Sequence, residues 1–205
     1  MTNYKLTYFD FDGGRAESVR ITFHAAGIEF EDHRISFPEF GETRGGFRFT
    51  AVPVLEVDGD AVTQSNGMLR YIGKQAGLYP EDGLQAMYCD EALGAVEDSY
   101  HKTVSTFFLE GDELIEARKK LVEHWLTPYL KGLNEILLRG GGEYFADGCL
   151  TVADLKVFVH IRSLLNGTLD HVSTDLVPQL APALVEHHSR IEGEPVVVAY
   201  YNSRS

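Results

Sequence analysis

The step Val52-Pro53 stands directly in front of a short hairpin pattern and constrains the fold more than any other feature of the chain. The pattern consists of an apolar run, a turn and a second short run: Val54–Val57, Asp58-Gly59 and Ala61-Val62. Asp-Gly between two such runs is a strong hairpin signal. Because proline cannot donate a hydrogen bond to a sheet, it marks a strand start or a special turn. The sequence therefore predicts two paired strands that open at Pro53.

The backbone around Val52 is a candidate ligand site. Only ~5–6% of X-Pro bonds are cis, but a cis bond here would leave the Val52 N–H and C=O free to pair with an extended, peptide-like ligand. In the following Gln64-Ser65-Asn66, Ser65 stands at the expected N-cap of a helix, where free N–H groups and the dipole favour a carboxylate. The two features suit a small acidic peptide. The alternative is an ordinary hairpin followed by a capped helix.

Charge and composition exclude several kinds of partner. The net charge of −13 at pH 7 argues against nucleic acids and anionic membranes, since both require basic patches. Cys89 and Cys149 have neither CxxC nor metal-ligand spacing, which indicates free thiols in a reducing compartment. The histidines show no metal spacing that includes a carboxylate partner. With no signal peptide and no apolar run of ~20 residues, we expect a soluble, cytoplasmic protein without a metal ion.

The first 79 residues alternate between strand and helix patterns. The predicted order is strand, helix, strand, short helix, two strands and helix, over residues 5–9, 15–26, 29–35, 37–49, 54–62 and 65–75. This order, with a proline at the third strand, predicts a thioredoxin-like α/β domain. Since no CxxC accompanies it, thiol–disulfide oxidoreduction is not expected. Residues 79–83, with Pro80 and Gly83, are the predicted linker.

From residue 84 onward the patterns are helical only. They cover residues 84–108, 113–138, 151–165, 177–190 and 195–201. We therefore predict an all-α domain over 84–205 that follows an α/β domain over 1–79.

One local signal within the helical region is specific. Thr151 and Asp154 have the spacing of a capping box, and Leu150 and Leu155 that of a hydrophobic staple. This combination predicts the start of a buried helix. It therefore assigns Asp154 a structural role and not that of a catalytic acid.

Several separated motifs, in order along nearly the whole chain, resemble the sigma class of glutathione transferases. They are Leu6-Thr-Tyr-Phe9, Gly14-Arg-Ala-Glu17, Phe30-Glu-Asp-His-Arg-Ile35, Val52-Pro-Val-Leu-Glu-Val-Asp-Gly59, Gln64-Ser65 and the box at 151–154. The resemblance implies a thioredoxin-like domain, an all-helical domain and glutathione as co-substrate. It also implies a cytoplasmic, detoxifying homodimer that adds the glutathione thiolate to small electrophiles.

The resemblance assigns roles to individual residues. Tyr8 would donate a hydrogen bond to the glutathione sulfur, with Arg15 beside it, and these two are the implied catalytic residues. Val52, before Pro53, would pair its backbone with the cysteinyl group of glutathione.

The γ-glutamyl end of glutathione has its own implied partners. Gln64 and Ser65 would hold it within one subunit. Asp98 would reach the γ-glutamyl amine of the glutathione bound to the neighbouring subunit, which implies a homodimer.

Three residues depart from the pattern at the glycyl end of the glutathione site. Phe40 stands where many relatives have a tryptophan that donates to the glycyl carboxylate. Ala51 stands where relatives often have lysine or glutamine, whereas Arg44 replaces a lysine that it can match. These departures bear on glutathione affinity and not on the chemistry at sulfur.

The electrophile would be bound by Phe9, Arg15, Tyr100, Lys156 and His160. Lys156 and His160 are four residues apart and so share one helix face, and Tyr100 would supply a stacking wall. If the pair faces the pocket, it favours compact electrophiles with a carboxylate, carbonyl or nitro oxygen. The alternative is that both side chains point into a polar network between helices.

Two other functions are compatible with the same site. One is a glutathione-dependent isomerase, in which the sulfur leaves again. The other is a catalytically idle structural or binding protein of the S-crystallin kind. Retention of Tyr8, Arg15, Gln64 and Ser65 counts against this last alternative.

Overall fold

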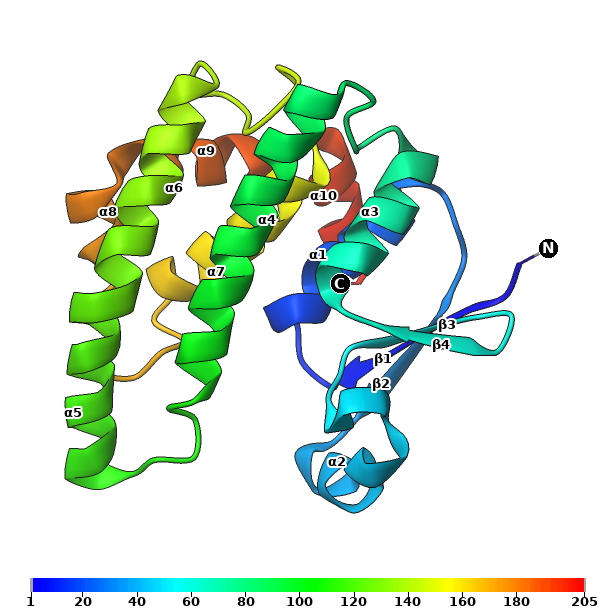
Figure 1. Ribbon diagram of the computed structural model, residues 1–205, viewed down its shortest axis with the longest axis horizontal. Helices are drawn as coiled ribbons and strands as arrows, with labels where there is room; N and C mark the ends of the chain where they lie inside the picture. Colours follow the sequence, from blue (N-terminus) through cyan, green and yellow to red (C-terminus); the bar gives the residue numbers. More distant parts are fainter. Residues whose placement is uncertain (1, 205) are drawn as a thin grey trace.

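The computed structural model describes residues 2–204, in which a small α/β layer is joined to a larger group of helices (Figure 1). The strands are β1 (Tyr4–Phe9), β2 (Glu31–Ile35), β3 (Val54–Val57) and β4 (Asp60–Thr63). The helices are α1 (Gly14–Ala25), α2 (Phe37–Thr43), α3 (Ser65–Ala76), α4 (Gly83–Val104), α5 (Gly111–Leu121), α6 (Thr127–Arg139), α7 (Val152–Leu165), α8 (Leu176–Leu180), α9 (Pro182–Glu192) and α10 (Pro195–Asn202). The predicted fold class is confirmed.

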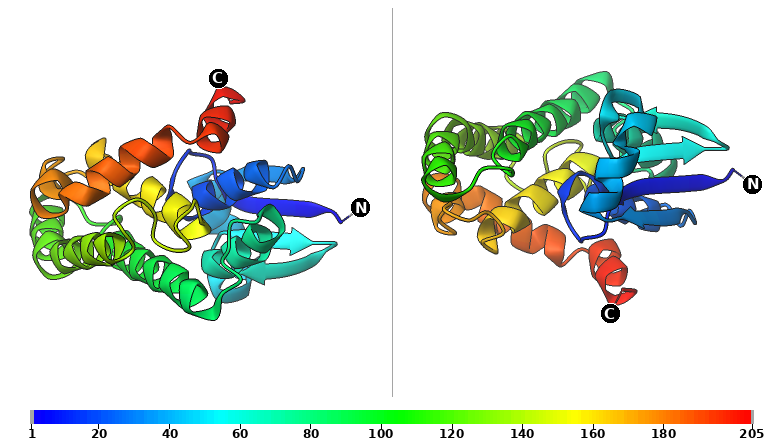
Figure 2. Two further views of the ribbon diagram at one scale, coloured as in Figure 1. Left: turned by 90° about the horizontal axis from the view of Figure 1, so that it is seen from above. Right: turned by 90° about the horizontal axis from the view of Figure 1, so that it is seen from below.

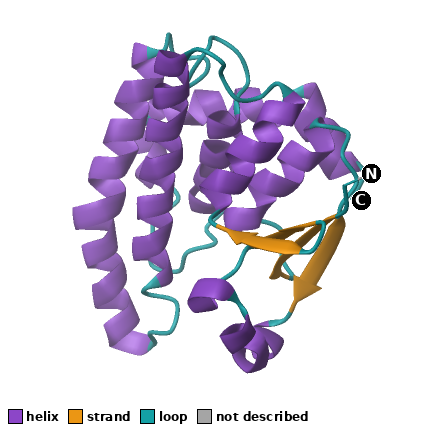
Figure 3. Cartoon of the chain, turned by 45° about the vertical axis from the view of Figure 1, so that its right-hand side comes forward, coloured by secondary structure: helices purple, strands orange, loops and turns teal. Residues whose placement is uncertain are grey.

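The four strands form one mixed sheet in the order β2-β1-β3-β4. Strand β1 is parallel to β2 and antiparallel to β3, and β3 and β4 form the predicted hairpin. Leu6 pairs with Leu55 at the centre of the sheet, where both side chains are buried. Helices α1 and α3 lie on one face of the sheet and α2 on the other (Figure 3). The Val52-Pro53 peptide bond is cis and leads directly into β3.

Proline divides two of the predicted helices. Residues 113–138 form α5, a π-helical turn at Val122–Leu126, and α6. Pro128, in the first turn of α6, has no N–H for the carbonyl four residues earlier, so the regular ladder is interrupted. The Thr127 N–H bonds to the Val122 carbonyl instead. In the same way, the predicted helix 177–190 divides into α8 and α9 in front of Pro182.

Helix α7 is buried along most of its length and forms the centre of the helical region. Its apolar side chains, such as Phe158 and Val157, belong to cores that also include residues of α1, α4 and α9. At the far end of the chain, α10 returns to the side of α1 (Figure 2). There the Tyr200 hydroxyl donates to Glu17 Oε1 at 3.2 Å. The α/β layer and the helices are therefore packed into one continuous interior.

Asp154 organises the start of α7 as the capping-box spacing predicted. Its Oδ2 accepts from the Thr151 N–H at 2.8 Å and from Thr151 Oγ1 at 2.7 Å. Its Oδ1 accepts from the Phe145 N–H at 2.9 Å and lies 2.9 Å from His187 Nε2. Because every one of these partners is internal and buried, the carboxylate serves the fold.

Candidate functional site

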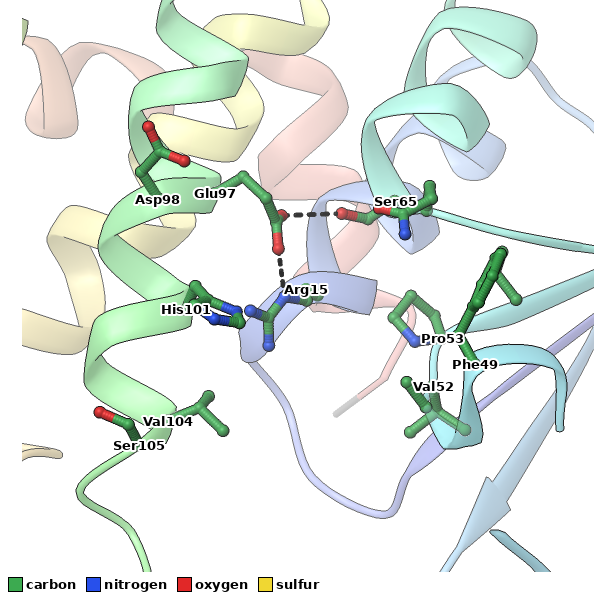
Figure 4. Close-up of a pocket in the computed structure, with 13 residues that line it drawn as sticks. Arg15, Phe49, Val52, Pro53, Ser65, Glu97, Asp98, His101, Val104 and Ser105 are labelled. Carbon is green, nitrogen blue, oxygen red and sulfur yellow. Dashed lines mark hydrogen bonds and ion pairs between the residues drawn. The ribbon is translucent and has the colours of Figure 1, made fainter. Parts of the chain in front are cut away.

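A cleft of about 520 Å³ lies between α4 and the strand-to-helix junctions of the α/β layer (Figure 4). It is lined by Arg15, Phe49, Ala51, Val52, Pro53, Thr63, Gln64, Ser65, Glu97, Asp98, His101, Val104 and Ser105. Apart from Tyr8, Phe40 and Arg44, every residue predicted to contact glutathione is among them. The structure thus brings together residues from four separated segments of the chain. Phe49, Glu97 and His101 were not singled out from the sequence.

Arg15 lines the cleft, and Tyr8 is bonded to its backbone without lining the cleft itself. The backbone N–H of Arg15 donates to the Tyr8 hydroxyl at 3.2 Å, which leaves the phenolic proton available to another acceptor. Burial raises the pKa of Tyr8, although the Arg15 N–H and side chain oppose this, so the hydroxyl stays protonated at neutral pH. Gly14 has φ +63°, and a Cβ there would lie 2.6 Å from the Tyr8 hydroxyl. The first position of α1 therefore requires glycine to make room for this group.

Glu97 connects the two sides of the cleft. Its Oε1 accepts from Arg15 Nε at 2.6 Å, and its Oε2 accepts from Lys156 Nζ at 2.7 Å and Ser65 Oγ at 3.2 Å. Although burial alone would raise it, the charges of Lys156 and Arg15 lower the pKa of Glu97 to about 2. The carboxylate is therefore ionised and holds the Arg15 guanidinium in place. The sequence hints at this role only in that Glu97 is a carboxylate directly before Asp98 on the same predicted helix.

Lys156 lies elsewhere than in the expected electrophile pocket. Its side chain is 1% exposed, and Nζ donates to Glu97, Asn66 Oδ1 and Ser65 Oγ. This is the inter-helix polar network that was the alternative for Lys156, because a buried ammonium needs acceptors on several sides. Burial lowers the pKa of Lys156 to about 8, against the attraction of Glu97. For the Lys156 ammonium, desolvation outweighs the attraction of Glu97, so the charged form is disfavoured. For the part-exposed Glu97 carboxylate, the attraction of two cations outweighs desolvation, so the charged form is favoured.

The start of α3 lies one residue earlier than the N-cap prediction placed it. Gln64 is the N-cap, with φ +76°, and Ser65 is the first helical residue. A non-glycine residue with positive φ is uncommon and typical of sites where the backbone is held for a purpose. Gln64 and Ser65 both line the cleft, at the N-terminus of α3.

Asp98 is exposed on α4 and lines the outer part of the cleft. Within its own chain its Oδ2 accepts from the Tyr129 hydroxyl at 3.3 Å. In Figure 4 its side chain points away from Arg15, whereas that of Glu97 points toward it.

Phe9, Phe40 and Arg44 line neither the cleft nor the cavity described next. Phe9 packs between aromatic rings, at centroid distances of 4.5 Å to Phe37 and 5.1 Å to Phe40. The Arg44 guanidinium lies over the Phe40 ring at 5.9 Å. The prediction that Phe9 lines the electrophile pocket is therefore wrong, because its ring packs against the aromatic rings of α2 instead.

A second, smaller cavity of about 260 Å³ adjoins the cleft and shares Arg15 and Val104 with it. It is lined by Tyr8, Phe11, Gly14, Arg15, Tyr100, Thr103, Val104, Phe107, His160, Ser163, Thr168 and Leu169. Tyr100 and His160, both expected at the electrophile site, lie here. Arg15 is thus at the junction of a cleft with charged groups in its wall and a largely apolar cavity, and Tyr8 lines that cavity.

The described residues 2–204 contain no group of three or more His, Cys, Asp or Glu side chains arranged to hold a metal ion. Within the same range, no helix combines the length and apolar character needed to cross a membrane.

Comparisons with known proteins agree with this geometry. The family models for the glutathione S-transferase N-terminal and C-terminal domains match residues 4–74 and 97–204. The chain is 30% identical over 192 residues to glutathione S-transferase 3 of Caenorhabditis elegans, covering 91% of this chain and 92% of the relative. It is also 30% identical over 208 residues to the hematopoietic prostaglandin D synthase of Gallus gallus, covering 100% and 98%.

A solved structure has the same fold over nearly the whole chain. The structure of prostaglandin synthase D of Nilaparvata lugens superposes with a TM-score of 0.84 at 26% identity, covering 99% of this chain and 98% of the other. With matched family models for both regions and a cleft at the junction where the sequence predicted glutathione to bind, the chain belongs to the glutathione S-transferase family and uses glutathione as its co-substrate.

Proposed function

We propose that this transferase holds glutathione in the 520 Å³ cleft and presents its sulfur to a compact electrophile in the 260 Å³ cavity. The observation that carries the proposal is the position of Tyr8 and Arg15. Arg15 lines both spaces, and the Tyr8 hydroxyl accepts one internal hydrogen bond while keeping its own proton. A thiol at this junction would receive that proton's hydrogen bond and face the cavity.

A hydrogen bond from Tyr8 to the glutathione sulfur can raise the reaction rate only by a limited factor. A free thiol of pKa ~8.5 is only about 3% thiolate at pH 7. A hydrogen bond to a charged group stabilises it by roughly 1.5–3 kcal/mol, or about one to two pKa units. Two units raise the thiolate fraction roughly 25-fold, of which lower basicity cancels nearly tenfold at a Brønsted slope of ~0.4–0.5. Most of the acceleration must therefore come from holding the electrophile beside the sulfur.

The other cleft residues would position the peptide. The backbone of Val52, before Pro53, would pair with the cysteinyl group, and Gln64 and Ser65 would bind the γ-glutamyl end at the start of α3. Phe40 and Ala51 offer no charged partner to the glycyl carboxylate, which leaves Arg44 as the predicted cation for it. We therefore expect glutathione affinity to depend mainly on the γ-glutamyl and cysteinyl contacts.

Asp98 supports a homodimer. Its carboxylate is exposed at the outer edge of the cleft, where it would pair with the γ-glutamyl ammonium of a glutathione bound in the partner subunit. If so, Asp98→Ala weakens glutathione binding measured by calorimetry, and sedimentation detects a dimer. A stable monomer with full glutathione affinity would contradict this proposal.

We assign glutathione binding to a domain of residues 1–79 and the electrophile cavity chiefly to a domain of residues 84–205, whose ends, 1 and 205, lie outside the described part. The break between α3 and α4 supports this division. The free Cys89 and Cys149 fit a cytoplasmic, detoxifying enzyme.

The direct test of the function is Tyr8→Phe, which removes one hydroxyl and little volume. We expect a lower kcat/KM with an aryl halide at neutral pH, retained glutathione binding, and a rate profile displaced to higher pH. An unchanged rate and profile would mean that another group, such as Arg15, activates the sulfur.

A glutathione-dependent isomerase is the second candidate, because the relatives include prostaglandin D synthases. The cavity of about 260 Å³ lies below the ~300–1,000 Å³ usual for ligand pockets, which favours small substrates over a prostaglandin. A turnover screen with glutathione should include aryl halides, enals, hydroperoxides and prostaglandin endoperoxide. Preferred turnover of the endoperoxide would replace the conjugation proposal, and no turnover of any substrate would favour the idle, S-crystallin-like alternative.

A further inference from the structure

The wall of the cleft carries few positive charges for a site that binds an acidic peptide. Among the described residues that line it, Arg15 is the only lysine or arginine, whereas Glu97 and Asp98 are carboxylates. The whole chain has a net charge of −13 at pH 7. Because glutathione is itself a net anion, a γ-glutamyl carboxylate bound at Ser65 would be repelled by the nearby Glu97. A second cation close to Ser65 would remove this repulsion.

Lys156 is such a cation, although it does not line the cleft. Its Nζ lies behind the wall, where it donates to Glu97 Oε2 at 2.7 Å, to Ser65 Oγ at 3.4 Å and to Asn66 Oδ1. Ser65 Oγ in turn donates to the same Glu97 oxygen at 3.2 Å, as Figure 4 shows. One ammonium therefore contacts both the hydroxyl expected to bind the γ-glutamyl end and the carboxylate that would repel it.

The surroundings of this ammonium are fixed by the fold. Asn66 Nδ2 donates to the Leu93 carbonyl of α4 at 3.2 Å, which leaves Asn66 Oδ1 free to accept from Lys156. The Lys156 side chain is 1% exposed on α7. It is therefore out of reach of a ligand in the cleft and can act on one only through Ser65 and Glu97.

We propose that Lys156 is a positioning residue for glutathione, which neutralises Glu97 and holds the Ser65 hydroxyl where the γ-glutamyl carboxylate binds. The inference rests on the proposed function, which places that end of the peptide at the start of α3. When the peptide binds, the Ser65 hydrogen turns from Glu97 to the ligand oxygen. Arg15 and Lys156 stay on the two oxygens of Glu97, so this carboxylate keeps its donors and its place.

The proton on Lys156 sets the charge that the ligand meets. Glu97 and its two cations carry one net positive charge together, which falls to zero when the ammonium loses its proton. The charged groups that act on Lys156 are Glu97 from α4, Arg15 from α1 and Arg70 from α3. His160, one turn along α7, is neutral, since burial and Lys156 lower its pKa to about 4.

Glutathione binding and protonation of Lys156 should therefore strengthen each other. A carboxylate nearby favours the charged form of a lysine, and such coupling is reciprocal. Because burial lowers the pKa of Lys156 to about 8, both forms are present near pH 8. Binding at that pH should draw a proton from the buffer.

The test measures this proton uptake with S-methylglutathione, which keeps the γ-glutamyl end and has no thiol to titrate. Calorimetry at pH 8 in buffers of different ionisation enthalpy gives the protons taken up. For a coupling of about tenfold, the parent should take up roughly 0.4 of a proton more per ligand than Lys156→Met. Uptake by the ligand amine is common to both proteins and cancels. At pH 7, Kd should be roughly tenfold higher in Lys156→Met.

Two further variants control this comparison. Lys74→Met removes the same charge from an exposed position on α3, so it should match the parent in Kd and in proton uptake. Lys156→Arg keeps the charge but does not titrate near pH 8. It should therefore lack the extra uptake, even where Lys156→Met is too unstable to measure.

Each other outcome is decisive. Unchanged affinity in Lys156→Met would overturn the inference and leave glutathione binding in the cleft intact. So would weaker binding with the parent's proton uptake, because the side chain would then act through packing and not through charge. An equal loss in Lys74→Met would overturn it as well, since any lysine would have the same effect. A parent that does not bind S-methylglutathione would remove the proposed function and the inference with it.

Discussion

The cleft and the small cavity differ in how their polar groups are partnered. In the cleft, Arg15, Glu97, Lys156 and Ser65 form one connected network with contacts of 2.6–3.4 Å. In the cavity, by contrast, the Tyr100 hydroxyl and His160 Nδ1 have no partner. The polar groups of the cleft are therefore bonded to one another, whereas two polar groups beside the small cavity have no hydrogen bond.

This difference matches the two roles in the proposed function, which are binding of glutathione and binding of the electrophile. In the proposed function, the fixed charge network would position the constant co-substrate, and preorganisation would reduce the cost of ordering on binding. The small cavity, in which the Thr103, Ser163 and Thr168 hydroxyls already bond inside the protein, would select the second substrate chiefly by the size and shape of its apolar part. Substitutions in the cleft network should therefore change stability and affect every electrophile alike, while substitutions in the cavity should act on some electrophiles only.

The largest effect is expected for Glu97→Gln. It leaves the buried Lys156 ammonium without its carboxylate, and breaking a buried pair in this way costs about 3 kcal/mol of unfolding free energy. Denaturant titration measures the loss. Asp98→Asn is the matched control, since it removes the same charge one residue along α4 at an exposed position. Equal losses of unfolding free energy in both variants would show that the buried network stabilises the protein no more than an exposed charge does.

A second variant identifies the cause of that loss. Adding Lys156→Met to Glu97→Gln removes the unpaired ammonium, so part of the lost stability should return. Coupling of this kind is what a double-mutant cycle measures. If the two losses simply add, the ion pair does not hold the cleft together.

The pH dependence follows from the same carboxylate. The folded pKa of Glu97 is about 2, below the usual ~4.3 of an unfolded glutamate. The stability that this difference provides is therefore fully present above about pH 4.3 and is lost as the pH falls towards 2. Thermal unfolding between pH 5 and 2 should show a shallower decline in Glu97→Gln than in the parent. Parallel curves would contradict the ion-pair network.

A smaller effect, on activity, is expected for Gly14→Ala at the junction of the two spaces. The added carbon would lie 2.6 Å from the Tyr8 hydroxyl at a backbone φ of +63°, so the hydroxyl must move. We expect kcat/KM to fall about tenfold, or ~1.4 kcal/mol, for an aryl halide and an enal alike. Gly67→Ala is the control, because nothing lies within 4 Å of the carbon added there. A loss confined to one substrate would place Tyr8 in the cavity's selection of electrophiles.

The smallest effect is expected for Thr151→Ala, which touches neither space. Loss of the hydroxyl that bonds Asp154 Oδ2 should lower the unfolding free energy by about 1 kcal/mol, as for other N-caps. Turnover per folded molecule should not change, and Thr151→Ser should restore stability. Lost activity at unchanged stability would give Thr151 a chemical role.

The fold could be predicted from the sequence because its signals are local. The Asp58-Gly59 turn, the proline before β3 and the Thr151–Asp154 spacing each fix structure within a few residues, and their order identifies the family. Helix breaks were missed at Pro128 and Pro182, where a long apolar pattern continues across the proline. Hydrophobic periodicity shows which face is buried and does not report the hydrogen-bond ladder.

The site could be predicted only where motifs carry it. Arg15, Val52, Gln64 and Ser65, which the motifs single out, line one cleft, and their roles toward glutathione stay predictions. The position of Lys156 depends on which residues face it across three helices, and no spacing along α7 contains that information. Glu97 was missed for the same reason, since its importance comes from Arg15 and Lys156, 82 and 59 residues away in the chain.

The wall shared by the cleft and the cavity, at Arg15 and Val104, bears on how the product leaves. A conjugate joins the two occupants by one covalent bond, so each half is held at high effective concentration while the other stays bound. The product can then dissociate only when the contacts in the cleft and those in the cavity are broken at the same time. Product inhibition should therefore be tighter than inhibition by glutathione or by the electrophile alone, and release of the conjugate becomes a candidate for the slow step of turnover.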